Sequence, residues 1–297
     1  MYHNPVMLQE SLEGLSLREG GTYADLTFGG GGHSRAILSA LKGGRLIALD
    51  QDPEAHAHAP LDDRLTMVHG NFRYITQYLR YLKAIPLDGI LADLGISSHQ
   101  IDEGRRGFST RTDARLDMRM DPQMTSDAAR VVNEYTVEAL EAVFRNYGEL
   151  PSARKLSASI IRIRAERPIA TTGDLVLAVK PFTPSGQEHK FLAQVFQALR
   201  IAVNDEIEAL KEMLLQVPSL LKPGGRLVVI AYHSLEDRLV KHFMRSGNFE
   251  DKPEADFYGN RSLPFRLITR KAVVPTAQEI TRNNRARSAR LRVAERI

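Results

Sequence analysis

The chain has 297 residues, 43% of them hydrophobic, with a formal net charge of +4 and no cysteine. This composition indicates a globular protein of one large or two modest domains, and it excludes a disulfide framework and cysteine-ligated metals. The small positive charge favours a polyanionic partner. No apolar run approaches membrane-spanning length and no signal pattern begins the chain, so we expect a cytoplasmic protein without a membrane partner, and we assign no metal ligands.

Four consecutive glycines at residues 29–32 lie between an apolar, β-prone run at 23–28 and an amphipathic stretch at 34–41. Strand, glycine loop and helix form the first unit of a nucleotide-binding α/β fold, because bare backbone turns tightly and a helix N-terminus offers free N–H groups. A dinucleotide fingerprint would place a third glycine at position 34, where this chain has Ser34. Together with Asp25 inside the strand, this favours an amino-acid-like ligand over a pyrophosphate.

Further apolar runs predict strands at 45–50, 65–69, 88–95 and 226–232, and helices at 9–15, 53–60 and 72–82. Asp50 ends the second strand at about the distance expected for a ribose-hydroxyl acceptor, while Asp52 is the better cap for the next helix. Phe72 follows the third strand, where it either stacks on an adenine or packs at the helix entry. Asp93 leaves the carboxyl end of the fourth strand, where doubly wound folds place their chemistry.

The last third of the chain brings a second candidate strand end and a basic block. His233 follows the fifth strand, where it either faces a ligand or belongs to a capped helix start through Ser234 with Asp237 as partner. Arg285 and Arg287 belong to an arginine block that binds phosphate or, alternatively, forms a solvated tail. Residues 221–225 predict a turn, and 265–269 and 291–293 predict antiparallel edge strands.

Between the fourth and fifth strands the chain is charged and helical. Arginines and aspartates crowd the loop that starts at Glu103, and helical patterns follow at 126–132, 137–147, 151–167 and 189–217. Because no strand pattern interrupts residues 104–185, we predict an inserted helical domain there, which recognises a large anionic substrate. Gln197, Arg200 and Asn204 lie beside the apolar stripe of the last helix, either as structural hydrogen-bonding groups or pointing into the site.

Three acidic residues at neighbouring strand ends define the predicted site. Asp25 lies in the strand before the glycine loop, Asp50 ends the second strand and Asp93 ends the fourth. This is the layout of an S-adenosylmethionine-dependent methyltransferase, with the glycine loop passing the methionine part of the ligand, Asp50 taking the ribose and Asp93 facing the departing methyl group.

At these residues the sequence resembles the bacterial small-subunit ribosomal RNA cytosine-N4 methyltransferases. The matching blocks are HNPVML (3–8), DLTFGGGGHS (25–34), DLGISSHQID (93–102), RGFS (106–109), RLDMRMD (115–121), FQALRIAVN (196–204), LKPGGRLVVIAYHSLEDRLVKHF (221–243) and NNRARSARLRVAER (283–296). The resemblance implies methylation of a cytidine in the decoding region of 16S ribosomal RNA, within the small subunit. It also implies a Rossmann-like, mostly parallel methyltransferase domain at 1–103 and 186–297, interrupted by the helical insertion at 104–185.

The same resemblance assigns the S-adenosylmethionine contacts to Gly31, Gly32, His33, Asp50, Phe72, Asp93 and Gln100. From the chemistry of a delocalised amine, we expect Asp93, or the backbone carbonyls of Leu94 and Gly95, to accept its hydrogens. The second-rank candidates are Ser97, Ser98, Asp117 and His233. The expected substrate contacts are Arg106, Asp117, Arg119, Arg200, Arg285 and Arg287. The chain departs from the family pattern at His99, where proline is usual, at 147–150, which lacks a second glutamate, and at 189–195.

Three rival functions share parts of this pattern. A nicotinamide-dependent oxidoreductase would share the fold but would have glycine in place of Ser34. A non-catalytic RNA-binding protein would explain the arginines but neither Asp50 nor Asp93. A DNA amino-methyltransferase would show a proline-proline-aromatic tetrapeptide after the fourth strand, where this chain has Leu94, Gly95 and Ile96.

Overall fold

The structure is a computed structural model that describes residues 5–252 and 263–297. The chain forms two compact units: a sheet unit, Met1–Gly95 with Ile207–Ile297, and a helical unit, Ile96–Glu206. The predicted boundaries at 104 and 185 lie inside the helical unit, because the helices next to both boundaries belong to it. His3 and Asn4 of the 3–8 block lie outside the described residues.

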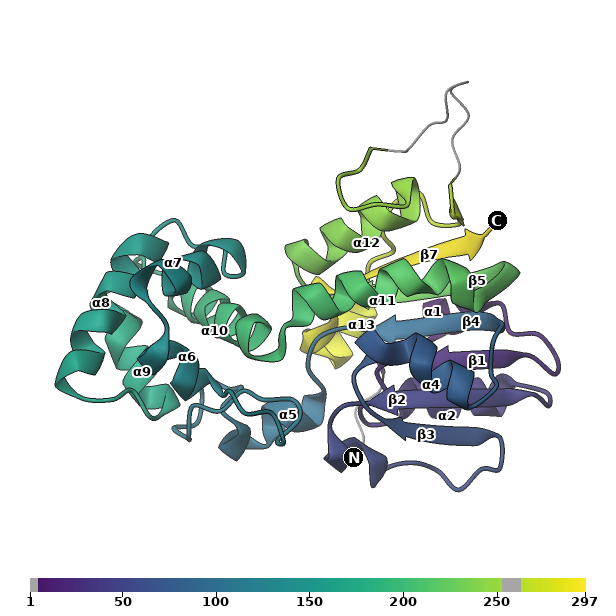
Figure 1. Cartoon of the computed structure of the whole chain (residues 1–297), viewed down its shortest axis with the longest axis horizontal. Coiled ribbons are helices and arrows are strands. Elements are labelled where there is room, and N and C mark those ends of the chain that lie inside the picture. Colours follow the sequence, from purple (N-terminus) through teal and green to yellow (C-terminus); the bar gives the residue numbers. More distant parts are fainter. Residues whose placement is uncertain (1–4, 253–262) are drawn as a thin grey trace. The chain divides into compact units, whose positions relative to one another are not determined.

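The sheet unit is built on seven strands, which Figure 1 shows with their connecting helices. The strands are β1 (Thr22–Asp25), β2 (Arg45–Asp50), β3 (Leu65–His69), β4 (Leu87–Asp93), β5 (Leu221–Ala231), β6 (Phe265–Leu267) and β7 (Arg290–Arg296). Their order is β3-β2-β1-β4-β5-β7-β6, with β1 to β5 parallel and β7 antiparallel to both of its neighbours. The predicted mostly parallel α/β sheet is therefore confirmed. The order reverses between β1 and β4, where such sheets form their ligand crevice.

Helices cover both faces of this sheet, as the doubly wound prediction requires (Figure 1). They are α1 (Leu8–Leu15), α2 (Gly32–Ala40), α3 (Pro53–His56), α4 (Ile75–Tyr81), α11 (Glu206–Leu220), α12 (Ser234–Ser246) and α13 (Ala277–Arg282). Leu79 of α4 and Leu214 of α11 pack in one core, whereas Leu15 of α1 and Ile37 of α2 pack in a second core. Successive residues of the central strands alternate between these cores, so the strands are apolar on consecutive positions.

The helical unit has a core of its own, which confirms the predicted helical insertion. Its helices are α5 (Ser98–Asp102), α6 (Ala128–Glu134), α7 (Val137–Asn146), α8 (Ala153–Glu166), α9 (Thr172–Val179) and α10 (Glu188–Asn204). Phe144, Leu156 and Leu199 are fully buried in this core. Burial of each such side chain contributes about 1.5–3 kcal/mol. Helix α9 was not predicted, although Thr171 and Asp174 form a capping box at its start.

Three predicted elements differ in the structure. The single helical pattern at 189–217 is two helices, α10 and α11, separated by Asp205 in the left-handed conformation at φ 51°. Aspartate tolerates this conformation, and the apolar stripe continues because each helix buries it in the core of its own unit. The predicted turn at 221–225 is the first part of β5, which bulges against β4 between Leu87 and Gly89. Of the two strands predicted at the edge, β6 is an edge strand, whereas β7 lies inside the sheet between β5 and β6.

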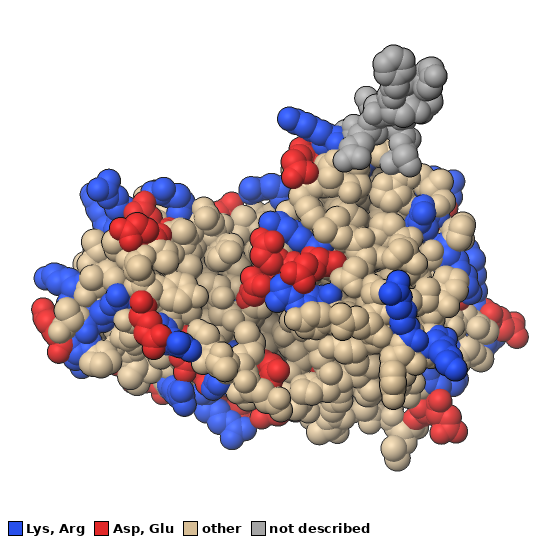
Figure 2. Space-filling model, in the orientation of Figure 1, with Lys and Arg blue, Asp and Glu red and all other residues tan. Residues whose placement is uncertain are grey.

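No helix within the described ranges is both long and apolar enough to span a membrane. On the face shown in Figure 2, basic and acidic side chains lie next to one another in several places. This mixture agrees with the near balance of 40 lysines and arginines against 36 aspartates and glutamates.

Candidate active site

The glycine loop between β1 and α2 presents bare backbone to solvent. Gly31 precedes α2 with φ 73°, and a Cβ on it would lie 2.5 Å from Cζ of Phe28. Only glycine fits there without moving that ring. A Cβ on Gly30 would meet no atom within 4 Å, so open space lies directly beside the chain. The loop therefore lets a ligand approach the main chain closely.

Asp25, at the end of β1, is completely buried. Its carboxylate accepts hydrogen bonds from the hydroxyl of Ser34 at 2.6 Å and from the backbone N–H of Thr27 at 3.2 Å. Burial raises the pKa of Asp25, and the nearby His33 opposes that shift. Ser34 stands where a dinucleotide fingerprint has glycine, and its hydroxyl is used to hold this carboxylate.

Asp50, at the end of β2, holds the glycine loop from the neighbouring strand. Its Oδ2 accepts a hydrogen bond from the N–H of Gly29 at 2.7 Å, and its Oδ1 accepts one from the N–H of Asp52 at 2.8 Å. Burial raises the pKa of Asp50 to about 6, although both N–H groups favour the charged form. Asp52 caps α3 by accepting from the N–H of Glu54, as predicted, so Asp50 is not needed for that role.

Asp93, at the end of β4, is the third carboxylate of the site. The hydroxyl of Tyr232 donates to its Oδ1 at 2.8 Å, and Nδ1 of His33 lies 3.6 Å from its Oδ2. Its backbone N–H donates to Oγ1 of Thr27, which ties β4 to the residues after β1. Burial raises the pKa of Asp93 to about 6, while His33 and the hydrogen bond from Tyr232 act in the opposite direction. The side chain is 20% exposed, so a ligand can reach it.

These three carboxylates lie at the carboxyl ends of adjacent parallel strands, β2, β1 and β4. Asp25 raises the pKa of both Asp50 and Asp93 by like-charge repulsion. Within the described part of the chain, none of the three forms an ion pair with lysine or arginine. Buried acids without a cation penalise the folded protein, which is typical of a site built for a ligand.

The other predicted residues of the sheet unit have structural partners. His233 caps α12, with its Nδ1 accepting from the N–H of Glu236 and its Nε2 lying 3.1 Å from Glu236 Oε1. The observed cap therefore lies one residue earlier than the predicted cap through Ser234 and Asp237. Asp237 instead pairs with Arg292 at 2.7 Å. Phe72 is half-buried and packs against the core next to α4.

Ser97 and Gln100 belong to the helical unit and define the start of α5. The hydroxyl of Ser97 accepts from the N–H of Gln100 at 3.2 Å, and Oε1 of Gln100 accepts from the N–H of Ser97 at 3.0 Å. This reciprocal capping box fixes the turn that follows β4. His99, the departure from the family pattern, is exposed on the same helix.

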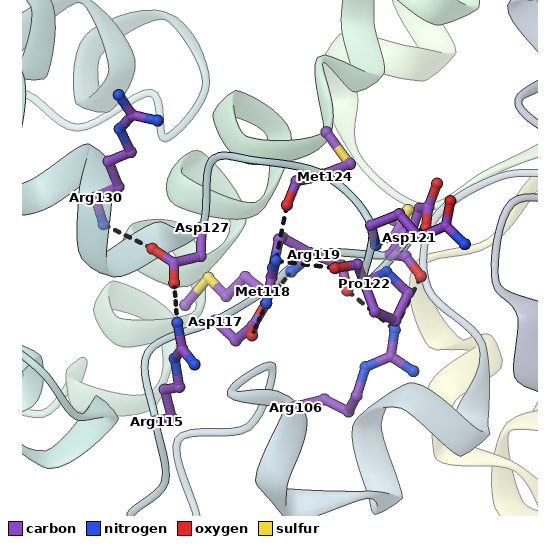
Figure 3. A network of polar contacts seen from close by, with 12 residues as sticks. Arg106, Arg115, Asp117, Met118, Arg119, Asp121, Pro122, Met124, Asp127 and Arg130 are labelled. Atoms are coloured by element: carbon purple, nitrogen blue, oxygen red, sulfur yellow. Dashed lines mark hydrogen bonds and ion pairs between the residues drawn. The ribbon is translucent and has the colours of Figure 1, made fainter.

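The arginines of the charged loop are engaged in internal contacts, drawn in Figure 3. Arg119 forms two parallel hydrogen bonds with Asp117, each 2.7 Å long, and its third nitrogen donates to the carbonyls of Pro122 and Met124. Arg106 donates to the carbonyls of Arg119 and Met120. Although burial raises the pKa of Asp117, the Arg119 contacts hold it below its usual value. These contacts fold the loop back on itself, while its Leu116, Met118 and Met120 are buried in the core of the helical unit.

The polar residues beside the stripe of α10 also serve the helical unit. Asn204 accepts from the N–H of Met120 at 2.7 Å and donates to the carbonyl of Met118 at 2.8 Å. Gln197 donates to the carbonyl of Tyr147, and Arg200 forms a bidentate pair with Glu206 at 2.9 Å. They form the structural hydrogen bonds that we gave as one of two alternatives.

The C-terminal arginines present a different surface. A short 3₁₀ turn, Asn284–Ser288, is anchored by the buried Ala286 and capped by Asn283. Arg285 is half-buried, whereas Arg287 is exposed. The turn therefore holds a cation outward on rigid backbone.

Sequence reasoning did not single out Tyr232, the contact of Asp93. The signal was present, because both residues end predicted strands that carry apolar runs. What was missing is the pairing of β4 with β5, which sets Asp93 opposite Ile230, two residues before Tyr232.

The chain matches known proteins over its whole length. The model of the MraW methylase family matches residues 1–297. Ribosomal RNA small subunit methyltransferase H of Parabacteroides distasonis is 56% identical over 298 residues, which cover 100% of this chain and 98% of that protein. The proteins of the same name from Amoebophilus asiaticus and Flavobacterium johnsoniae are each 53% identical, covering 99% and 100% of this chain and 96% and 98% of theirs.

Proposed function

Because the chain belongs to the MraW methylase family, we propose that it transfers the methyl group of S-adenosylmethionine to the exocyclic N4 amine of a cytidine in the decoding region of 16S ribosomal RNA. The observation that carries this proposal is 56% identity over the whole chain to a ribosomal RNA small subunit methyltransferase H. The three carboxylates at adjacent strand ends support it independently.

The residues of the sheet unit fit the proposed methyl donor. When bound, S-adenosylmethionine supplies a methyl group already activated by a positively charged sulfonium. Asp25 and Asp93 are buried without a lysine or arginine partner among the described residues, so a cationic ligand would stabilise their charged forms. The open space beside Gly30 leaves room for the ligand next to the main chain.

We assign the donor contacts as the resemblance implies. Gly31, Gly32 and His33 bind the methionine part, where the backbone is bare and the N-terminus of α2 begins. The carboxylate of Asp50 accepts two backbone N–H groups and retains capacity for ribose hydroxyls, because it has about four lone-pair sites. The half-buried ring of Phe72 stacks on the adenine, and Gln100 is the last of the assigned donor contacts.

Asp93 is the proposed catalytic residue. The amine of cytosine is a poor nucleophile because its lone pair is delocalised into the ring. An acceptor on the amine hydrogens localises that lone pair and stabilises the developing positive charge. Asp93, partly exposed and charged above about pH 6, provides this acceptor, with the carbonyls of Leu94 and Gly95 beside it. Ser97 and His233 stay second-rank candidates.

The base must leave its stack to reach this site, which suits an RNA loop. We propose that the insertion at 104–185 recognises that RNA, with Asp117, Arg106, Arg119 and Arg200 shaping its surface. Arg285 and Arg287 contact phosphates from the sheet unit. A substrate within the small ribosomal subunit would place the reaction in the cytoplasm.

The test is transfer of labelled methyl from S-adenosylmethionine to naked 16S RNA, to a partly assembled particle and to the finished small subunit. We expect N4-methylcytidine in the digested RNA, identified by mass spectrometry, with at least one of these substrates. Methylation of another atom would overturn the assigned specificity, and no transfer to any of them would leave a non-catalytic RNA-binding protein. An ultraviolet difference spectrum with reduced nicotinamide cofactor tests the oxidoreductase alternative.

A further inference from the structure

The two oxygens of the Asp93 carboxylate have different partners within the sheet unit. Oδ1 accepts the hydroxyl hydrogen of Tyr232 at 2.8 Å, and Oδ2 faces Nδ1 of His33 at 3.6 Å. Tyr232 directly follows β5 and His33 is the second residue of α2, so two different elements contact this one side chain.

The orientation of His33 follows from its other ring nitrogen. Nε2 of His33 lies 3.0 Å from the carbonyl oxygen of Val6, and a carbonyl only accepts, so Nε2 carries a hydrogen in every protonation state. Nδ1 is therefore the ring nitrogen that faces Oδ2 of Asp93, and the contact with Val6 holds the ring in that orientation.

Tyr232 is held in place as a hydrogen-bond donor. Its backbone N–H donates to Oε2 of Glu236 at 3.0 Å, which fixes the turn between β5 and α12. Burial, followed by the nearby Asp93, raises the pKa of the Tyr232 phenol well above its ordinary value. The phenol thus keeps its hydrogen throughout the neutral range and always donates to Asp93.

The remaining charged groups around the pair act against the charged form of Asp93. Asp25 of β1 and Glu236 of α12 each repel its negative charge, and Glu279 of α13 adds to the field at Tyr232. Against burial and these acids, the structure provides two opposing groups, the imidazole of His33 and the phenol of Tyr232.

We propose that Tyr232 is a positioning residue that acts through Asp93, and that together with His33 it keeps the Asp93 carboxylate charged and in one orientation at neutral pH. This inference rests on the proposed methyl transfer, in which Asp93 accepts from the amine. In this proposal Tyr232 contributes to the reaction through its hydroxyl and not through its aromatic ring.

The test is Tyr232→Phe, which removes the hydroxyl and keeps the ring. Loss of one hydrogen bond to the charged form should move the acid limb of the pH profile of methyl transfer upward by about one pH unit. Activity should fall severalfold near pH 6.5 and return towards the unsubstituted level near pH 8.5. His33→Asn should move the limb in the same direction. Equal loss of activity at every pH would overturn the proposal.

Tyr23→Phe is the matched control, because Tyr23 is also a buried tyrosine of the sheet unit and its hydroxyl accepts from the N–H of Arg18. This variant removes one partly buried hydrogen bond that does not involve Asp93, so the acid limb of the pH profile of methyl transfer should not move. A shift as large as that of Tyr232→Phe would show a general effect of lost stability and would contradict the proposal.

A second measurement does not need the reaction. Carbon-13 NMR of labelled aspartate in the ligand-free protein reports the titration of Asp93, whose signal is the one lost in Asp93→Asn. Tyr232→Phe should raise its midpoint by about one pH unit. If the titration midpoint of Asp93 rises but the protein methylates no RNA, the proposed function is overturned and the positioning role of Tyr232 stands. If the protein methylates RNA but the midpoint does not move, the proposed function stands and the positioning role is overturned.

Discussion

The sheet unit and the helical unit treat charged side chains in opposite ways. In the sheet unit, Asp25 is fully buried and Asp50 and Asp93 are partly buried, all without a lysine or arginine partner in the part of the chain described, and burial raises the pKa of each. In the helical unit, the side chains of Asp117 and Arg119 are about as exposed as that of Asp93 but form a bidentate pair, and the pKa of Asp117 is lowered. The first arrangement costs stability, whereas the second organises a loop.

This contrast separates two kinds of charged residue that look alike in the sequence. A cluster of charges becomes a binding site where it lacks counter-charges, and becomes scaffold where they are supplied within the chain. The predictions that follow test the division, starting with the largest effect.

The largest effect is expected for Asp93→Asn at saturating methyl donor. The amide keeps the shape of the side chain but has one acceptor oxygen and no charge, so methyl transfer should fall by about 100-fold or more. Single-turnover transfer of labelled methyl measures this. Asp62→Asn is the control, because Asp62 pairs with Arg64 before β3, and it should retain full activity. Full turnover in Asp93→Asn would refute the catalytic assignment.

The same Asp93→Asn variant should be more stable than the unsubstituted protein, and increasingly so at higher pH. A carboxyl whose pKa is raised to about 6 on folding contributes stability that is fully present below about pH 4 and lost as the pH rises through 6. The gain in unfolding free energy should therefore grow by up to about 3 kcal/mol from pH 4 to pH 7. Urea unfolding without ligand at both pH values measures the difference in unfolding free energy between the variant and the unsubstituted protein. A difference that does not depend on pH would contradict the raised pKa of Asp93 as its cause.

A smaller loss of stability is expected for Arg119→Leu, which leaves Asp117 partly buried without its cation. After allowance for the 19% exposure of both side chains, the unfolding free energy should fall by about 2 kcal/mol. Arg130→Ala, which breaks an exposed pair with Glu134, should leave the unfolding free energy unchanged. If Arg119→Leu weakened RNA binding with unchanged stability, Arg119 would be a substrate contact and the contrast between the units would fail.

The smallest effect is expected for Arg287→Ala, which removes an exposed cation without touching a core. Affinity for 16S RNA should fall a few-fold, and the slope of log affinity against log salt should become shallower by about one. Unfolding free energy should stay unchanged. Binding measured at several salt concentrations distinguishes a phosphate contact from a solvated tail, for which the slope would not move.

Much of the sheet could be predicted because its strands are short apolar runs with clear ends. The bounds of β2 and β3 were predicted to the residue, and the adjacency of three acidic strand ends followed from the fold class. The break at Asp205 could not be seen, because the apolar period continues through it. The contact of Asp93 with Tyr232 could not be predicted either, because the two residues are 139 positions apart and meet only through the order of the strands.

The sequence could not distinguish arginines that bond to groups within the chain from arginines that are exposed to solvent. Arg119 and Arg287 both lie in segments rich in positive charge, yet one is held by Asp117 and two carbonyls while the other is exposed. The difference depends on how the loop folds back on itself, which no local pattern of charges determines.

The interruption of the sheet unit by residues 96–206 has a consequence for synthesis. The helical unit is continuous in the chain and can fold as soon as it leaves the ribosome, because all of its core residues have then been made. The central strand β4 must wait for β5, whose first residue follows the last residue of β4 by more than 120 positions. Until then one edge of β4 has no neighbour, and Asp93 has no Tyr232. The group of acidic strand ends is thus completed late, and a nascent chain that stalls before β5 exposes an open strand edge to aggregation.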